Sequence, residues 1–164
     1  MKLPLNCSVD YLCDFLNKQE ASELYQTLIN KYHLNKSRLI IEAGGKQIET
    51  DSFKILFSTE RLINLNSHPE HIHGKSFVWS GLMAKLRERV EKLLNKEFEM
   101  AMCLYYPDGN YFAPYHSDQQ TSGIETILPS ISLGEIRKFS FKDNDSEDEY
   151  SLDLANGSLL IMGN

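Results

Sequence analysis

The chain has 164 residues, enough for one compact domain with a hydrophobic core and too few for two ordinary domains. Hydrophobic residues make up 41% and charged residues 24%, a balance that excludes disordered, collagen-like and membrane-spanning chains. The sequence has no apolar run of the ~20 residues that a membrane helix needs and no signal peptide. We therefore expect a single domain spanning residues 1–164, cytoplasmic or nuclear, with no membrane partner.

Charge is distributed unevenly along the chain. Seventeen basic and 23 acidic residues give a net charge of −6. The rest of the chain is close to neutral, because five of the acidic residues lie close together: Asp143, Asp145, Glu147, Asp148 and Glu149. Because nucleic-acid binding depends on a local basic patch and not on the total charge, the composition does not exclude a nucleic-acid partner.

Two helices are predicted from spacing and capping signals. The first begins at Asn17, a favourable N-cap residue, with Glu20 three positions later, and has Ala21, Leu24, Tyr25, Leu28 and Tyr32 at helical spacing. The second covers residues 79–95, with one apolar face. Its other face is basic. We interpret this basic face as a solvent-exposed surface in preference to an interaction site.

The remaining elements are predicted to be short strands. Residues 38–43 and 46–50 flank Gly44 and Gly45, which suit a tight hairpin, and residues 53–57 form a further strand. Later strands are predicted at residues 98–106, 126–133, 136–142, 150–154 and 158–162. Early helices and many late strands indicate an α+β fold, a β-sandwich or jelly roll with helices packed on its outside.

One short motif indicates metal chemistry. His116 and Asp118 are two residues apart, so in an extended segment both side chains point to the same side. A histidine and a carboxylate, joined by a second histidine, make the facial triad that holds Fe(II) and leaves open positions for oxygen chemistry. Taken alone, the pair is more typical of a structural histidine that is hydrogen-bonded to a neighbouring aspartate.

The surroundings of this pair resemble the AlkB family of Fe(II)/2-oxoglutarate-dependent dioxygenases. The motifs that carry the resemblance are Tyr106-Pro107-Asp108-Gly109, then His116-Ser117-Asp118 seven residues on, Ser132-Leu133-Gly134 with Arg137, Phe139 and Phe141, and Asn156-Gly157-Ser158-Leu159-Leu160-Ile161-Met162. The resemblance covers nearly the whole chain and is stronger from about residue 98 onward.

The resemblance implies a double-stranded β-helix, or jelly roll, with two supporting N-terminal helices. It also implies an oxidoreductase that binds Fe(II) through His116 and Asp118 and binds 2-oxoglutarate through Tyr106. The implied reaction is oxidative demethylation, in which an N-methyl group of a DNA or RNA base is hydroxylated and leaves as an aldehyde. Such an enzyme would act in DNA repair or RNA demethylation on methylated DNA or RNA.

The resemblance also suggests substrate contacts. Gln120 stands where the family often has an acidic residue facing the alkylated base, and an amide cannot neutralise a cationic base. Residues 50–58, which include Phe53, lie where the family carries its nucleotide-recognition flap. Arg137, with Lys138, Lys142 and the basic face of the second helix, would contact phosphates. Leu104 replaces a family asparagine that contacts 2-oxoglutarate.

The family's spacing places the distal histidine ligand, the arginine that binds 2-oxoglutarate and the last strands beyond Asn164. We therefore expect the domain to be C-terminally incomplete and inactive as given. A substitute ligand could come from His68, His71 and His73, which lie in a predicted Pro- and Gly-flanked loop, and two of which could meet a metal if the segment is extended.

Two other functions remain open. Gln120, Leu104 and the acidic stretch are compatible with the same oxidation of a protein side chain or small molecule. The missing distal ligand is compatible with a non-catalytic binding module on the same fold. The sequence indicates no phosphate-binding glycine loop, no dinucleotide fingerprint and no nucleophile elbow, and it does not predict an oligomeric state.

Overall fold

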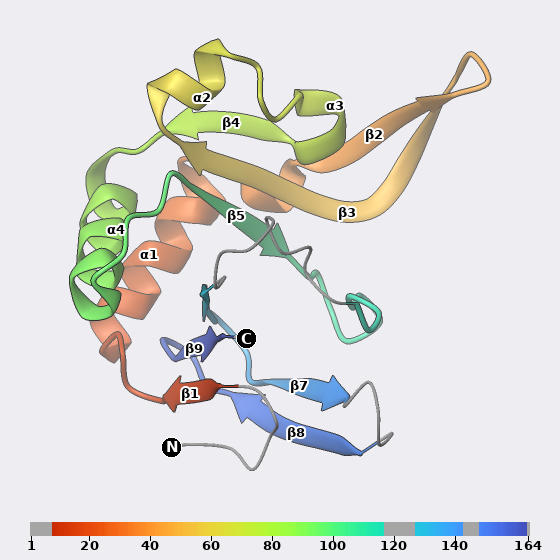
Figure 1. Ribbon diagram of the computed structural model, residues 1–164. Helices are drawn as coiled ribbons and strands as arrows, with labels where there is room; N and C mark the ends of the chain where they lie inside the picture. Colours follow the sequence, from red (N-terminus) through yellow and green to blue (C-terminus); the bar gives the residue numbers. More distant parts are fainter. Residues whose placement is uncertain (1–7, 117–126, 143–147, 164) are drawn as a thin grey trace. The chain divides into compact units, whose positions relative to one another are not determined.

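A computed structural model describes residues 8–116, 127–142 and 148–163 (Figure 1). Asp118, Gln120 and three members of the acidic stretch lie outside these ranges. The chain divides into two compact units: a terminal unit of Met1–Tyr25 and Ala113–Asn164, and a central unit of Gln26–Phe112. Both combine helices with mainly antiparallel strands. Among the described residues, no helix is long and apolar enough to cross a membrane.

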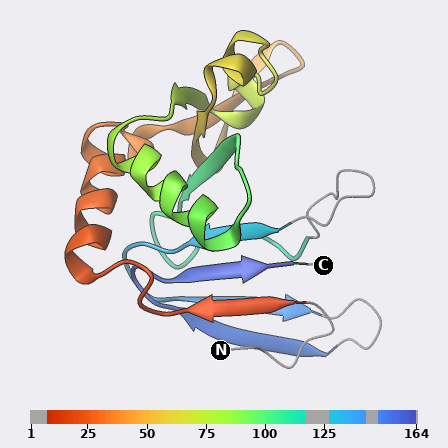
Figure 2. The same ribbon diagram turned by 60° about the vertical axis from the view of Figure 1, so that its left-hand side comes forward.

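The terminal unit contains two sheets. The first has three antiparallel strands, with β9 (Leu159–Met162) between β1 (Val9–Leu12) and β6 (Leu128–Ile131) (Figure 2). The second is the hairpin of β7 (Arg137–Lys142) and β8 (Glu149–Leu154). Four of these strands were predicted from the sequence. β1 was not, because four alternating residues are too few for a clear period-two signal.

Apolar side chains join these two sheets. Val9, Leu154 and Leu160 are buried, and around them pack Tyr11, Phe139, Phe141, Leu152 and Met162. The cluster thus draws residues from β1 and β9 on one side and from β7 and β8 on the other. Two sheets that share an apolar core have the layered arrangement of a sandwich. Closure of these strands into a complete double-stranded β-helix stays a prediction.

Helix α1 (Lys18–Asn30) begins with the expected capping box. The Glu20 backbone N–H donates to Asn17 Oδ1 over 2.9 Å, and the Asn17 N–H donates to the Glu20 carboxylate over 2.8 Å. Ala21, Leu24 and Leu28 are buried on one face, as their spacing predicted. The predicted capping box and buried face are therefore confirmed, but the helix ends at Asn30, so Tyr32, which the spacing had included, lies beyond it.

The central unit is built on one long strand, β3 (Lys46–Ser58). It pairs antiparallel with β2 (Arg38–Ala43) and β5 (Met100–Tyr105) and parallel with β4 (Lys75–Val78). The helical segments of this unit are the 3-10 turn η1 (Leu34–Lys36), α2 (Glu60–Asn64), α3 (Glu70–His73) and α4 (Gly81–Leu94).

The expectation of separate strands at 46–50 and 53–57 was wrong. The chain continues as one strand through an irregularity opposite Arg38 and Ile40. There the Thr50 hydroxyl donates to the Leu39 carbonyl over 2.7 Å and accepts the Ser52 N–H. Because the side chain of Thr50 replaces missing ladder bonds, the strand does not have to end.

The segment predicted to be a Pro- and Gly-flanked loop also differs. Residues 70–73 form the short helix α3, and residues 75–78 form the strand β4. Pro69 at the N-cap of α3 is consistent with this, since proline is compatible with a helix start.

The second predicted helix, α4, begins at Gly81 and not at Trp79. The indole N–H of Trp79 donates instead to the Glu99 carbonyl over 3.2 Å.

An ion pair and a hydrogen bond fix the end of α4. The Glu91 carboxylate accepts the Phe98 backbone N–H and the Arg87 Nε–H, each over 2.8 Å. Burial alone would raise the pKa of Glu91, but the Phe98 N–H and the Arg87 guanidinium favour the charged form and hold the pKa below its usual value. Glu91 thereby connects the last turn of the helix to the chain that enters β5.

Replacing Glu91 with alanine should lower the free energy of unfolding by about 1–3 kcal/mol at neutral pH, because the part-buried Phe98 N–H and the Arg87 guanidinium lose their charged acceptor. Glu88→Ala, at an exposed position of the same helix, should change it by less than about 0.5 kcal/mol. Since the pKa of Glu91 is lowered on folding, its contribution is complete above the ordinary glutamic-acid pKa and is lost as the pH falls through the folded-state value. Urea unfolding of both variants at neutral and acidic pH measures this; an equal effect at both pH values would contradict it.

Candidate functional site

His116 lies in the terminal unit, at the end of the described stretch that follows β5, and its side chain is exposed. Its ring nitrogen Nδ1 lies 2.8 Å from the carbonyl oxygen of Pro114. A carbonyl oxygen can only accept, so this contact makes Nδ1 the protonated nitrogen of the neutral ring. Nε2 is then the nitrogen that carries the lone pair.

This tautomer fits a metal ligand. Histidines that bind metals almost always donate their other ring N–H to a carbonyl or carboxylate, which fixes the ring and raises its basicity. The Pro114 carbonyl plays that part for His116. The proposed second ligand, Asp118, lies outside the described residues. Within the described ranges, no three His, Cys, Asp or Glu side chains converge on a common metal position.

Tyr115, between Pro114 and His116, was not singled out by the H-x-D motif. The nearby Glu149 carboxylate of the β7–β8 hairpin raises the pKa of Tyr115, and Ser140 of the same hairpin lowers it in part. The position of Tyr115 directly before the H-x-D motif was a possible signal in the sequence. Its neighbours Glu149 and Ser140 lie more than twenty residues away, so the sequence did not reveal them.

Tyr106, the proposed 2-oxoglutarate contact, directly follows β5 in the central unit. By the two-residue period of a strand it shares a face with Leu104 and Met102. All three side chains are partly exposed, at 37%, 45% and 43% respectively. On that face, the phenol hydroxyl of Tyr106 follows the apolar side chains of Met102 and Leu104.

Phe53, the proposed substrate contact, is largely buried, with 8% exposure. The Arg38 guanidinium lies 4.8 Å from its ring centroid, and the rings of Tyr105 and Tyr111 lie 6.0 and 6.1 Å away. Phe53 is also paired across the sheet with Tyr105, the residue before Tyr106. The structure therefore brings Phe53 close to the strand end that carries Tyr106.

Arg137, the other proposed substrate contact, is the first residue of β7 in the terminal unit and is partly buried. Alternation along β7 places it on the same face as Phe139 and Phe141, which pack against the core. Lys138 and Lys142 lie on the opposite face. These three cations therefore do not form one continuous row for phosphates.

The histidines of α3 do not have the extended geometry required of a substitute ligand pair. His71 and His73 are two positions apart in a helix, so their side chains point in different directions. The rings of His68 and His73 are in contact, with centroids 5.2 Å apart. Burial, followed by the nearby His68, Lys54 and His71, lowers the pKa of His73.

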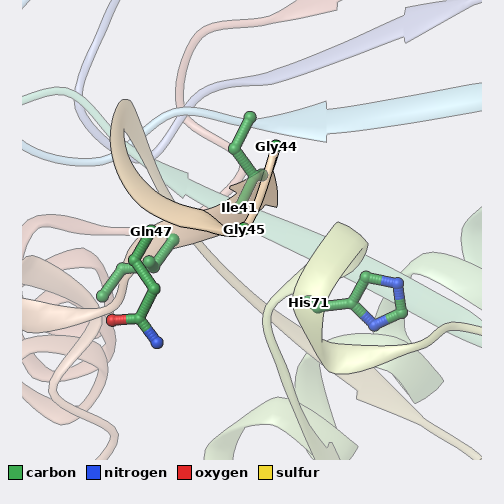
Figure 3. A pocket seen from close by; sticks show the side chains of 6 residues that line it. Ile41, Gly44, Gly45, Gln47 and His71 are labelled. Carbon is green, nitrogen blue, oxygen red and sulfur yellow. The ribbon is translucent and has the colours of Figure 1, made fainter.

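A pocket of about 760 Å³ lies in the central unit, between the β2–β3 hairpin and α3 (Figure 3). It is lined by Ile40, Ile41, Gly44, Gly45, Gln47 and His71. Of the residues that line it, only His71 was considered above, as a possible substitute ligand; the described candidates for iron, 2-oxoglutarate and substrate contacts are not among them. Ile40 and Ile41 are 46% and 38% exposed, so the pocket is an open, partly apolar surface beside the hairpin turn.

Comparison with known proteins defines the family. The model of the 2OG-Fe(II) oxygenase superfamily matches residues 8–164, and the chain belongs to this superfamily. The family's metal and co-substrate are Fe(II) and 2-oxoglutarate.

Two curated relatives are similar to the chain. DNA oxidative demethylase ALKBH2 of Bos taurus is 26% identical over 174 residues, which cover 96% of this chain and 58% of that protein. Uncharacterized protein R406 of Acanthamoeba polyphaga mimivirus is 25% identical over 77 residues, which cover 47% of this chain and 40% of that protein. The chain thus spans about half the length of the curated relatives it matches.

Proposed function

We propose that the protein carrying this chain is an Fe(II)- and 2-oxoglutarate-dependent oxidative demethylase of alkylated bases in DNA or RNA. The observation that carries the metal assignment is the hydrogen bond from His116 Nδ1 to the Pro114 carbonyl, which leaves Nε2 as the ligand nitrogen. Superfamily membership supports the oxidative chemistry. The named activity of the bovine relative supports a methylated nucleic acid as substrate.

In this proposal, His116 and Asp118 hold the iron and Tyr106 donates a hydrogen bond to 2-oxoglutarate. Bound Fe(II) and 2-oxoglutarate supply the oxidation of the N-methyl group. Gln120, Phe53 and Arg137 would contact the nucleic acid. The Gln120 amide would accept a hydrogen bond from the base without neutralising its charge.

The test is turnover by the full-length natural protein with Fe(II), 2-oxoglutarate and N-methylated DNA and RNA oligonucleotides, both single- and double-stranded. Mass spectrometry of the oligonucleotide and the yield of succinate and formaldehyde are measured together. We expect loss of one methyl group for each succinate formed. Consumption of 2-oxoglutarate without demethylation of any oligonucleotide would overturn the nucleic-acid substrate, and absence of any Fe(II) or Mn(II) binding would overturn the enzyme assignment.

A further inference from the structure

Two histidines beside the short helix α3 lie in contact within the central unit. The ring centroids of His68 and His73 are 5.2 Å apart, and the ring planes are inclined by 79°. Four residues separate them in the sequence, which is within the roughly three to five that commonly separate two histidine ligands of zinc. Both side chains are partly buried, so packing restricts their positions.

The separation of the two rings fits a shared tetrahedral ion. With zinc–nitrogen bonds of about 2.1 Å and a tetrahedral angle, two imidazole rings on one ion have centroids about 5 Å apart. The observed 5.2 Å is close to this value. Imidazole nitrogen suits zinc, copper and nickel, whereas Mn(II) and Fe(II) bind most weakly in the series of divalent metals. The pair therefore favours a different class of ion from the one proposed for His116.

The backbone holds the two histidines in place. Pro69 follows His68 directly and is the N-cap of α3, and its fixed φ angle restricts the chain between the two rings. The backbone N–H of His73 donates to the Pro69 carbonyl over 3.0 Å. At the other end of α3, a Cβ atom on Gly74 would clash with the Lys54 carbonyl, so the backbone there lies directly against β3. A segment fixed at both ends loses little entropy when an ion binds.

A small pocket adjoins this pair. His68 is one of the residues that line a cavity of about 210 Å³, and Ser58, Asn66 and Glu70 are others. Ser58 is the last residue of β3 and is 2% exposed, and its hydroxyl has no hydrogen-bond partner among the residues that the structure describes. Zinc-bound water is a strong donor because the ion lowers its pKa, and a serine hydroxyl can accept from it. The pocket thus offers room and an acceptor for water on such an ion.

One acidic and one basic side chain flank the pair. Glu70 lies three positions before His73 on α3, so the two side chains are on the same side of the helix. Lys75 lines the same pocket as Glu70, but its ammonium lies over the Phe77 ring, 5.4 Å from the centroid. In the described part of the chain, no three His, Cys, Asp or Glu side chains converge on one metal position. Glu70 therefore offsets the charge of an ion without being a third ligand.

We propose that His68 and His73 form a zinc-binding site of the central unit, with two protein ligands and with water in the remaining tetrahedral positions. The site is separate from the proposed iron ligands, since His116 belongs to the terminal unit. Bound zinc would join the connection between α2 and α3 to the end of α3. It would thereby stabilise this segment beside β3 and β4.

The test is zinc binding by the full-length natural protein carrying His116→Ala, which removes a proposed iron ligand that zinc would also occupy. Isothermal titration with Zn(II) measures the affinity, and nitrogen-15 NMR of the histidine rings identifies the ligands. His68→Gln and His73→Gln, made in this background, keep a polar side chain but remove the imidazole. His71→Gln is the matched control, because His71 is an exposed histidine of the same helix.

We expect Zn(II) to shift the ring nitrogen signals of His68 and His73 and to leave those of His71 unchanged. His68→Gln and His73→Gln should each weaken zinc binding more than about tenfold, since groups that only support metal ligands already contribute 10–100-fold. His71→Gln should retain the affinity. The zinc site is overturned if Zn(II) shifts neither ring or only one ring of the pair, or if His71→Gln weakens binding as much as the other two replacements.

Discussion

Replacing His116 with alanine should abolish oxidation of 2-oxoglutarate by the full-length natural protein. Removing a direct ligand should lower metal affinity by more than about a hundredfold, since residues that only support such ligands already contribute 10–100-fold. Succinate formation at saturating 2-oxoglutarate and Mn(II) affinity are the measurements. Because His116 is exposed, the unfolding temperature should change little.

His71→Ala is the matched control for this experiment. His71 is also an exposed histidine, and it lies on α3 in the central unit. Its replacement should leave metal affinity and turnover at the wild-type level. If His71→Ala removes metal binding while His116→Ala retains it, the ligand has been assigned to the wrong histidine.

Replacing Phe57 with alanine should produce the largest loss of stability. Phe57 is fully buried in β3, and its ring packs edge-on against Tyr32 with centroids 4.8 Å apart and lies 5.8 and 5.9 Å from Phe77 and Trp79. Truncating a buried phenylalanine costs about 3–5 kcal/mol, a large part of the roughly 5–15 kcal/mol that stabilises a typical domain. The unfolding temperature should fall by roughly 6–20 °C.

Phe112→Ala serves as the comparison, because Phe112 is 74% exposed and buries little apolar area. It should change the free energy of unfolding by less than about 0.5 kcal/mol. Urea denaturation of the two variants gives both values. A loss below about 1 kcal/mol in Phe57→Ala would contradict the prediction. It would mean that the neighbouring rings close the space left by the Phe57 side chain and that its ring contacts do not stabilise the central unit.

Features encoded by near neighbours in the chain were predictable from the sequence. The capping box of Asn17 and Glu20 fixes the start of α1 within four residues, and Gly44 and Gly45 fix the hairpin turn through their positive φ angles. The strands β7, β8 and β9 were found because alternation or apolar runs extend over several residues.

Features that depend on distant partners were not predictable. The strand β1 exists through pairing with β9, some 150 residues away, and β3 continues past residue 50 because the Thr50 side chain bonds to β2. The motif singled out His116, but its tautomer depends on the backbone carbonyl of Pro114, which no residue pattern specifies. The roles of Asp118 and Gln120 stay predictions.

One signal was present in the sequence and was not used. Arg137, Phe139 and Phe141 alternate with Lys138 and Ser140, which already indicates that Arg137 faces the core side of β7 and Lys138 the other side. Phosphate contacts by Arg137 and by Lys138, which stay predictions, would therefore come from opposite faces of the strand.

The strand β3 has a buried end and an exposed end. Its first residues, from Lys46 to Glu49, are exposed beside the hairpin turn, whereas Ile55, Leu56 and Phe57 are fully buried between β4 and β5. Replacements near the turn therefore cost little folding free energy, while the same replacements near Phe57 cost several times more. Natural variants can diversify the outer half of this strand without loss of the scaffold, so sequence drift should accumulate at one end and be purged at the other.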